Sequence, residues 1–413
     1  MPTRHDETLR AFGTRFRIYA QPRFLPGFET PETIWVGVPP GAIQAGPADA
    51  RMYVADAIDK LPYQPTDLPP CRGRLSPPVT AGADGHFDHL DTASREFGAA
   101  HIYAITRRVL DIWEGYLGRP IAWHFRDVQR RLELIPYVDW DNAQAGFGYV
   151  EAGFGRPKSG ETTPFCLNFD VLAHEVGHLI VFSLLGIPDD DTLTSQYLAY
   201  HESASDCVAL LSALHSDRMI EHLLNGCDGD LYVANELDRL AELSPSEQIR
   251  RASHSMRMAD VEGTQIPWQR LTQKQRHELG EPMTGALFDI LVEIFQERLV
   301  ERGLISRALA DLATRAANGE VDPEATRGEF ESAYRRDPAG FADALRAARD
   351  VVGIRLAVVW DELSPHHLSL GRAAAKFLTV DRRLSAGRYQ DITRAAFLWR
   401  QIGFGFAQKS TMN

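Results

Sequence analysis

The chain has 413 residues, of which 44% are hydrophobic and 24% charged, and its net charge is −12. This length allows two or three domains with a large core. No block of basic residues stands out, so nucleic acid is not an expected partner. No apolar run approaches the roughly 20 residues of a membrane-spanning helix, so a membrane is not an expected partner either.

Residues 1–90 are predicted to form an N-terminal extension that is irregular and partly β. Apolar residues cluster at strand length over 16–20 and 33–38. Prolines and glycines over 62–85 predict a connector. The first residues lack the apolar core of a signal peptide, so we expect a cytoplasmic location, with non-classical export left open. The four cysteines have no paired spacing and are expected to stay reduced.

Residues 91–225 are predicted to form a mixed α/β lobe. Apolar side chains at spacings of three and four predict a helix over 91–117, which Gly118 and a following proline end. Strands are predicted over 121–125 and 132–138. Glycines and prolines over 151–170 predict a loop.

Asn142 and Ala143 lie between the predicted strands and that loop, and two interpretations stay open for them. An Asp-Asn pair followed by glycines favours an ordinary turn. Alternatively, the pair lies on an edge strand, whose unpaired main-chain groups can bind any extended peptide.

The stretch over residues 171–182 is predicted to be a mostly buried helix, because its apolar residues follow a helical spacing. His174 and His178 are four residues apart, so both imidazoles lie on one face and can reach one metal ion. Glu175 can point at the open side of that ion. The H-E-x-x-H pattern is a known zinc-peptidase signature. A chance match on an exposed helix is the alternative, and the apolar flanks argue against it.

A second helix is predicted to begin near Tyr200. Glu202 and Asp206 lie one turn apart on it, so Glu202 can complete a set of three ligands. Asp206 can accept the ring N–H of a ligating histidine, most simply His174. The alternative is a surface pair of acidic residues near a helix start. The apolar residues 207–211 that follow favour burial.

The string His174-Glu175-x-x-His178 followed by Glu202-x-x-Ser205-Asp206 resembles the gluzincin arrangement of thermolysin-like and fungalysin-like metallopeptidases, over about residues 95–295. The resemblance implies one catalytic zinc ion, held by both histidines and Glu202. It also implies that Glu175 is the general base acting on a zinc-bound water.

The resemblance further implies an α+β fold with two lobes. The first is a mixed α/β lobe with an edge strand and the zinc helix, and the second, over 226–413, is mostly helical. In those enzymes an Asn-Ala pair on the edge strand binds the substrate backbone, which assigns that role to Asn142 and Ala143. Further helices are expected over 208–260, with a break at 225–230, and over 308–318, 323–335, 340–351, 372–378 and 389–399.

The string over residues 284–289 resembles the helix that follows the catalytic histidine of gluzincins, which makes His277 the candidate second donor to the oxyanion. The distance from His277 to Gly285 is longer than in thermolysin itself. A structural or solvated histidine is the alternative for this position, and His366 and His367 are weaker candidates for the same role. Tyr197 and Tyr200 do not match the thermolysin spacing and are expected to pack.

The sequence therefore predicts a zinc-dependent metalloendopeptidase with a peptide or protein substrate. Two alternatives stay open: a catalytically silent zinc-containing binding or scaffold protein, and a zinc hydrolase of a non-peptide amide or ester. The three consecutive aspartates at 189–191 could bind Ca²⁺, but a solvated acidic turn is favoured. The oligomeric state does not follow from the sequence.

Overall fold

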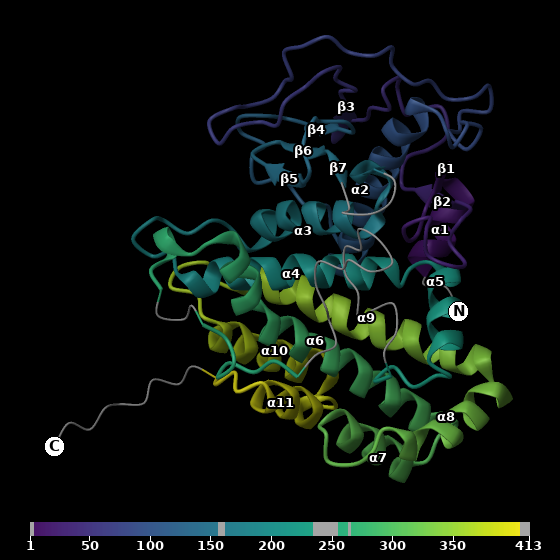
Figure 1. Ribbon diagram of the computed structural model, residues 1–413, viewed down its shortest axis with the longest axis vertical. Helices are drawn as coiled ribbons and strands as arrows, with labels where there is room; N and C mark the ends of the chain where they lie inside the picture. Colours follow the sequence, from purple (N-terminus) through teal and green to yellow (C-terminus); the bar gives the residue numbers. More distant parts are fainter. Residues whose placement is uncertain (1–3, 156–161, 234–254, 263–265, 405–413) are drawn as a thin grey trace. The chain divides into compact units, whose positions relative to one another are not determined.

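The computed structural model describes residues 4–155, 162–233, 255–262 and 266–404 (Figure 1). The chain divides into two compact units. One comprises Met1–Ser183 and Ser205–Arg251, and the other Leu184–Ala204 and Ala252–Asn413. All the named strands belong to the first unit, and both units contain helices. The predicted α+β class is confirmed at this level, and the thermolysin-like two-lobe arrangement stays a prediction.

The first unit begins with a helix and a hairpin-like pair of strands. Helix α1 (Arg4–Phe12) precedes β1 (Thr14–Ile18), which pairs antiparallel with β2 (Glu32–Val36). The two strands match the predicted segments at 16–20 and 33–38 with a shift of about two residues. The sequence did not predict α1, because it is mostly polar and buries little apart from Leu9 and Asp6.

A four-stranded sheet lies at the centre of the first unit, in the order β3 (Met52–Val54), β4 (Leu132–Ile135), β6 (Tyr149–Ala152) and β5 (Ala143–Gly146). The pairs β3–β4 and β4–β6 are parallel, whereas β5 runs antiparallel to β6. Strand β5 therefore lies at one edge of the sheet. Since β3 comes from the predicted extension, that stretch supplies the opposite edge.

The strand predicted over 121–125 is wrong, because this segment forms successive turns. The amide of Arg126 donates to the carbonyl of Trp123, and the amide of Val128 donates to the carbonyl of Phe125. Both aromatic side chains are buried. The short run of apolar residues at this position is therefore explained by side chains that are buried from a turn, and not by a strand that pairs in a sheet.

Helix α2 (Arg95–Leu117) confirms the helix predicted over 91–117 and packs against β1, β3 and β4. It begins at Arg95 because the Ser94 hydroxyl accepts a hydrogen bond from the amide of Phe97. It ends at Gly118, which adopts φ 76°, a left-handed conformation that glycine accepts without strain.

Helix α3 (Phe169–Leu185) follows the short strands β7 (Phe154–Gly155) and β8 (Thr163–Pro164) and the 3₁₀ turn Phe165–Leu167. Asn168 caps it, because its Oδ1 accepts from the amide of Val171 at 3.1 Å. After a loop come α4 (Ser195–Ala213) and α5 (Asp217–Gly226). The remainder of the helix predicted over 208–260 falls largely on residues 234–254, outside the described ranges.

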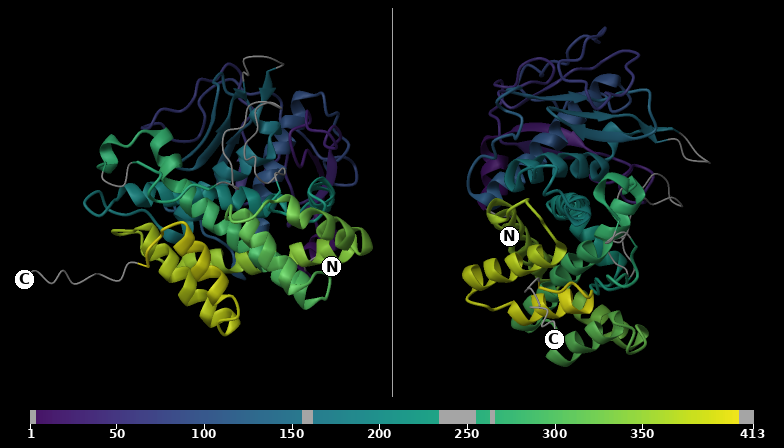
Figure 2. Two further views of the ribbon diagram at one scale, coloured as in Figure 1. Left: turned by 60° about the horizontal axis from the view of Figure 1, so that its bottom comes forward. Right: turned by 90° about the vertical axis from the view of Figure 1, so that its left-hand side faces the viewer.

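The second unit is helical apart from its connections (Figure 2). Its long helix α6 packs against α9 and α11, and α9 packs against α10. The predicted C-terminal helices are confirmed, and α9 and α10 are longer than expected. Their bounds are α6 Gln273–Glu301, α7 Arg307–Ala317, α8 Glu324–Arg336, α9 Pro338–Glu362, α10 Leu370–Ser385 and α11 Gln390–Trp399. No helix in the described ranges is long and apolar enough to cross a membrane.

Helix α1 is attached to the first unit through the buried carboxylate of Asp6. Its Oδ1 pairs with the guanidinium of Arg108 on α2, and its Oδ2 lies 3.2 Å from Nδ1 of His215. The other ring nitrogen of His215 lies 2.8 Å from the Tyr116 hydroxyl. Burial alone raises the pKa of Asp6, but His215 and Arg108 outweigh it and hold that pKa well below its usual range.

We predict that Asp6→Asn lowers the free energy of unfolding at pH 7 by about 3 kcal/mol, because a buried guanidinium loses its carboxylate. Urea unfolding measures this change. The folded-state pKa of Asp6 is depressed, so its contribution is present above the unfolded value near 3.9 and lost as the pH falls. The difference in stability between parent and variant should therefore begin to shrink below about pH 4 and disappear only at the depressed folded-state pKa.

Asp217→Asn is the matched control, because Asp217 on α5 also pairs with a residue of α1, Arg10, at 3.1 Å. Both of these side chains are about half exposed. A surface pair of this kind contributes less than about 1 kcal/mol. Equal losses in the two variants would contradict the assignment of Asp6 as the anchor of α1.

Candidate metal centre

Two imidazoles lie side by side on α3. The ring centroids of His174 and His178 are 4.6 Å apart, with their planes at 86°. The spacing of four residues places the rings one helical turn apart, as expected from the sequence. His174 is buried and His178 is partly exposed.

The following helix, α4, engages one nitrogen of each ring. Nδ1 of His174 lies 2.9 Å from Oδ1 of Asp206, and Nδ1 of His178 lies 2.9 Å from Oγ of Ser205. The Asp206 carboxylate can only accept, which favours the His174 tautomer with its lone pair on Nε2. The Ser205 hydroxyl can accept from Nδ1 of His178 in the same way, and this arrangement leaves Nε2 of both rings for a metal ion. The sequence proposed Asp206 as the partner of His174 and indicated no role for Ser205.

Glu202 lies one turn before Asp206 on the same continuous helix. One ligand atom from each of His174, His178 and Glu202 can be chosen so that all three lie within 4.8 Å of one another. Over the described ranges, no other group of three or more histidine, cysteine or acidic side chains comes together in this way. The three aspartates at 189–191 therefore form no comparable cluster.

The three side chains fit a zinc ion in kind and in number. Two imidazoles and one carboxylate, with an open fourth position, form a typical catalytic zinc site. Ligand atoms on a tetrahedral zinc ion lie roughly 3.4 Å apart, given bonds of about 2.1 Å. A separation below 4.8 Å is within reach of small rotamer adjustments. Imidazole ligands also disfavour Ca²⁺ and Mg²⁺, which prefer oxygen.

Gly177 allows α3 and α4 to approach closely enough for these contacts. A Cβ atom at this position would lie 2.9 Å from Cα of Ser205 and 3.1 Å from Cβ of Val208. The first of these atoms belongs to the backbone, so the helices would have to move apart. Gly177 lies immediately before His178 in the chain, and the site's geometry depends on this missing side chain.

Glu175 is held against the edge strand of the sheet. Its Oε2 accepts a hydrogen bond from the amide of Ala145 on β5 over 2.7 Å. Because Ala145 directs its N–H away from β6, its C=O also points to the open edge. The candidate base therefore lies beside the main-chain groups that an added peptide strand would pair with.

Asn142 and Ala143 lie at the start of the same strand. Ala143 is the first residue of β5, and its amide donates to Oδ1 of Asn142 at 2.9 Å. The carbonyl of Asn142 accepts from the amide of Gly153. Ala143 thus lies on the edge strand, whereas Asn142 lies in the bend directly before it. The residue that contacts Glu175 is Ala145, which the sequence did not single out.

His277 lies in the first two turns of α6, with its Nδ1 3.3 Å from Oε2 of Glu202. Its side chain is 21% exposed, so it is accessible from solvent. Gly280 allows α6 to lie close to α4 here, because a Cβ atom would meet the carbonyl oxygen of Ala199 at 2.6 Å. His277 is thus adjacent to the candidate ligand Glu202, although the two residues lie far apart in the sequence.

The other candidates for the second donor are engaged elsewhere. Nδ1 of His366 lies 2.8 Å from the hydroxyl of Thr192. The Tyr197 hydroxyl donates to the carbonyl of Gly186, and the Tyr200 hydroxyl accepts from the indole of Trp360. Both tyrosines are buried, as the sequence analysis expected of packing residues.

The string over residues 284–289 has a structural explanation in the second unit. Arg400, just after α11, pairs with both carboxylate oxygens of Asp289 at 2.9 and 3.0 Å. A Cβ atom at Gly285 would lie 2.7 Å from Cζ of Arg400, so glycine makes room for the guanidinium. The string therefore specifies how the C-terminal helix attaches to α6.

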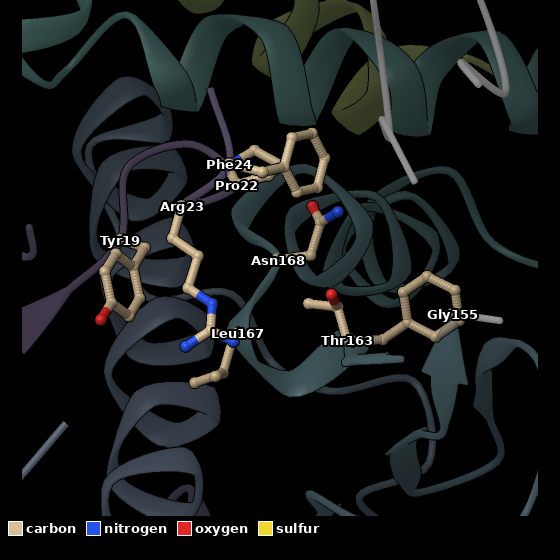
Figure 3. A pocket seen from close by; sticks show the side chains of 9 residues that line it. Tyr19, Pro22, Arg23, Phe24, Gly155, Thr163, Leu167 and Asn168 are labelled. Carbon is tan, nitrogen blue, oxygen red and sulfur yellow. The ribbon is translucent and has the colours of Figure 1, made fainter. Parts of the chain in front are cut away.

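A small cavity of about 10 Å³ lies beside the N-terminus of α3 (Figure 3). This volume is roughly that of one water position, so the cavity is too small for a substrate. Asn168, which caps α3, points into this region in Figure 3. The lining residues are Tyr19, Pro22, Arg23, Phe24, Gly155, Thr163, Phe165, Leu167 and Asn168.

Cys166 and Cys207, which flank the site in the sequence, are buried free thiols. Burial raises the pKa of Cys166 to about 12 and also raises that of Cys207. Over the described ranges, neither cysteine belongs to a group of three or more side chains that could hold a metal ion.

No protein-family model and no curated protein matches the chain. Among solved structures, the chain is similar to the precursor of protealysin, a metalloproteinase from Serratia proteamaculans, with 14% sequence identity and a TM-score of 0.38. The alignment covers 71% of this chain and 88% of that chain. A likeness at this level carries no argument about fold or activity, so the function has to be argued from the site.

We predict that Gly177→Ala weakens zinc binding by about 10- to 100-fold, because it displaces the partners of both ring Nδ1 atoms. Titration with a competing chelator measures the affinity. Gly328→Ala is the control, because Gly328 lies in helix α8 with no atom within 4 Å of an added Cβ. Parent-like affinity in Gly177→Ala would show that the helix approach does not set the ligand geometry.

Proposed function

We propose that the protein is a zinc-dependent metalloendopeptidase with a peptide or protein as its substrate. The observation that carries the proposal is the convergence of His174, His178 and Glu202, with Glu175 held against an open strand edge. The resemblance of these residues to the gluzincin pattern supports the same reaction.

Each residue has a role that its contacts support. His174 and His178 would hold the ion through Nε2, and Glu202 through a carboxylate oxygen. When bound, zinc supplies Lewis acidity that polarises the scissile carbonyl and lowers the pKa of a water to about 7. Glu175 would accept the proton from that water and pass it to the leaving amine.

The edge of β5 is the candidate binding surface for an extended substrate. A peptide added beside β5 would pair with main-chain groups of Ala143 and Ala145. The Ala145 amide is engaged by Glu175 over 2.7 Å in the substrate-free protein. Binding of a peptide would therefore exchange partners at this amide and bring the substrate backbone to the base.

His277 is the candidate donor to the oxyanion. Its Nδ1 lies 3.3 Å from Oε2 of Glu202, so this histidine is adjacent to a candidate metal ligand. A donor at this position would stabilise the negative charge that develops on the carbonyl oxygen. The same contact also supports a different role, in which His277 orients Glu202 as a ligand.

We predict that Glu175→Gln binds zinc like the parent and loses about 10²- to 10⁴-fold in kcat. Glutamine keeps an oxygen that can accept from the Ala145 amide but cannot take up the proton. Elemental analysis and cleavage of a peptide library measure the two effects. Glu278→Gln, on the exposed face of α6, should leave both unchanged.

Parent-like cleavage by Glu175→Gln would rule out Glu175 as the base. If the zinc-loaded parent cleaved no peptide in the library, a catalytically silent scaffold protein would be favoured. Cleavage of only esters or non-peptide amides would favour a zinc hydrolase of those substrates.

We predict that His277→Gln lowers kcat by about 10²- to 10³-fold, the usual effect of removing one oxyanion donor. Zinc affinity should change by less than tenfold. His366→Gln serves as the control, because His366 contacts Thr192 on the surface. A large loss of zinc affinity with parent-like kcat at saturating zinc would assign His277 to orienting Glu202 instead.

A further inference from the structure

Two buried carboxylates lie on neighbouring strands of the sheet and take no part in the proposed chemistry. Glu133 on β4 is 1% exposed, and Glu151 on β6 is fully buried. The strand pairing places both on the same face of the sheet. Buried carboxylates of this kind require close hydrogen-bond donors.

Residues 60–71, here called the strap, supply most of those donors. Lys60 Nζ lies 2.7 Å from Oε2 of Glu151, and the amide of Tyr63 donates to its Oε1 at 2.8 Å. The Tyr63 hydroxyl and the amide of Cys71 donate to Glu133 at 2.8 and 2.9 Å. The strap is therefore fastened to this face at three positions along its length.

Burial and the Glu133 carboxylate raise the pKa of Tyr63, so the phenol keeps its proton and acts as a donor. The Lys60 ammonium also lies 3.6 Å from the centre of the Tyr63 ring. These contacts join the two attachment sites of the strap into one network.

The network reaches the edge strand through Gln144. Gln144 is the cross-strand partner of Glu151, and its Nε2 lies 2.6 Å from Oε1 of Glu151 and 3.1 Å from the carbonyl of Tyr63. Gln144 directly precedes Ala145, whose amide holds Glu175. An unbroken series of contacts therefore leads from the strap to the candidate base.

Strand β5 needs such support. It has four residues and, among the residues that the structure describes, pairs only with β6, so its other edge is the candidate surface for a peptide. A short edge strand has few main-chain bonds to define its register, and a slip of one residue turns every side chain to the opposite face. On the face opposite Gln144 the strand carries only Ala143 and Ala145, whose small side chains offer little packing to define the register.

We propose that the strap positions the substrate-binding edge: Lys60 and Glu151, acting through Gln144, hold β5 in the register that presents Ala145 to Glu175 and to an extended peptide. The inference rests on the proposed peptidase function. Lys60, Glu151 and Gln144 are positioning residues, because none of them contacts the candidate ligands or Glu175 directly in the contacts described above.

Two variants test this proposal. Gln144→Leu removes only the connection to β5 and leaves Lys60 and Tyr63 on Glu151. Lys60→Met removes the positive charge that contacts Glu151, and Lys60→Arg should restore that charge. For a peptide substrate long enough to pair along β5, KM should rise about tenfold in Gln144→Leu and Lys60→Met, as expected for one lost hydrogen bond to a charged group.

A short acylated dipeptide, which does not extend along β5, should change in KM by less than about threefold, since only the pairing is affected. Zinc content should match the parent. Arg74→Met is the matched control, because Arg74 pairs with Asp59 and both side chains are largely exposed. Equal KM changes for the long and short substrates would assign the network to general stability and overturn the proposal.

Hydrogen exchange at the β5 amides provides a readout that does not depend on cleavage. Gln144→Leu and Lys60→Met should lose protection at Ala145, whereas Arg74→Met should not. Parent-like protection in both variants would overturn the inference even if the protein is a peptidase. Loss of protection in both variants, together with a parent that cleaves no peptide, would instead support the role of the strap and reject the proposed function.

Discussion

The candidate site depends on the close approach of two consecutive helices at a single glycine. Because Gly177 has no side chain, the backbone of α4 reaches the histidine face of α3, and Ser205 and Asp206 engage the two rings. The position of Glu202 then follows from helix geometry, since it lies one turn before Asp206. Helix α3 supplies two candidate ligands, and α4 supplies the side chains that orient them and the third candidate ligand.

Much of this arrangement was accessible from the sequence because it is local. Spacings of three and four residues placed His174 with His178 and Glu202 with Asp206, and helical periodicity identified α2 and the C-terminal helices. The strand predicted over residues 121–125 was wrong, because the aromatic side chains there are buried in turns and the segment does not pair in a sheet. Periodicity also missed α1, whose attachment relies on a buried ion pair and not on an apolar face.

The remaining features are contacts between residues far apart in the chain, which no local pattern encodes. The hydrogen bond from Ala145 to Glu175 spans 30 residues, and that from Tyr63 to Glu151 spans 88. Gly177 lies within the zinc-peptidase motif, but its role in helix packing depends on which atoms of α4 lie opposite it. The candidate site thus combines a motif that can be read locally with a support that only the folded chain brings together.

The ion pair between Asp289 and Arg400 bears on how the chain is synthesised. The two residues are separated by 111 positions, and the carboxylate lies within the long helix α6. During translation from the N-terminus, α6 leaves the ribosome well before the guanidinium that pairs with its partly buried carboxylate. This attachment therefore forms only after residue 400 has emerged, and a nascent chain stopped before residue 400 lacks the partner of Asp289.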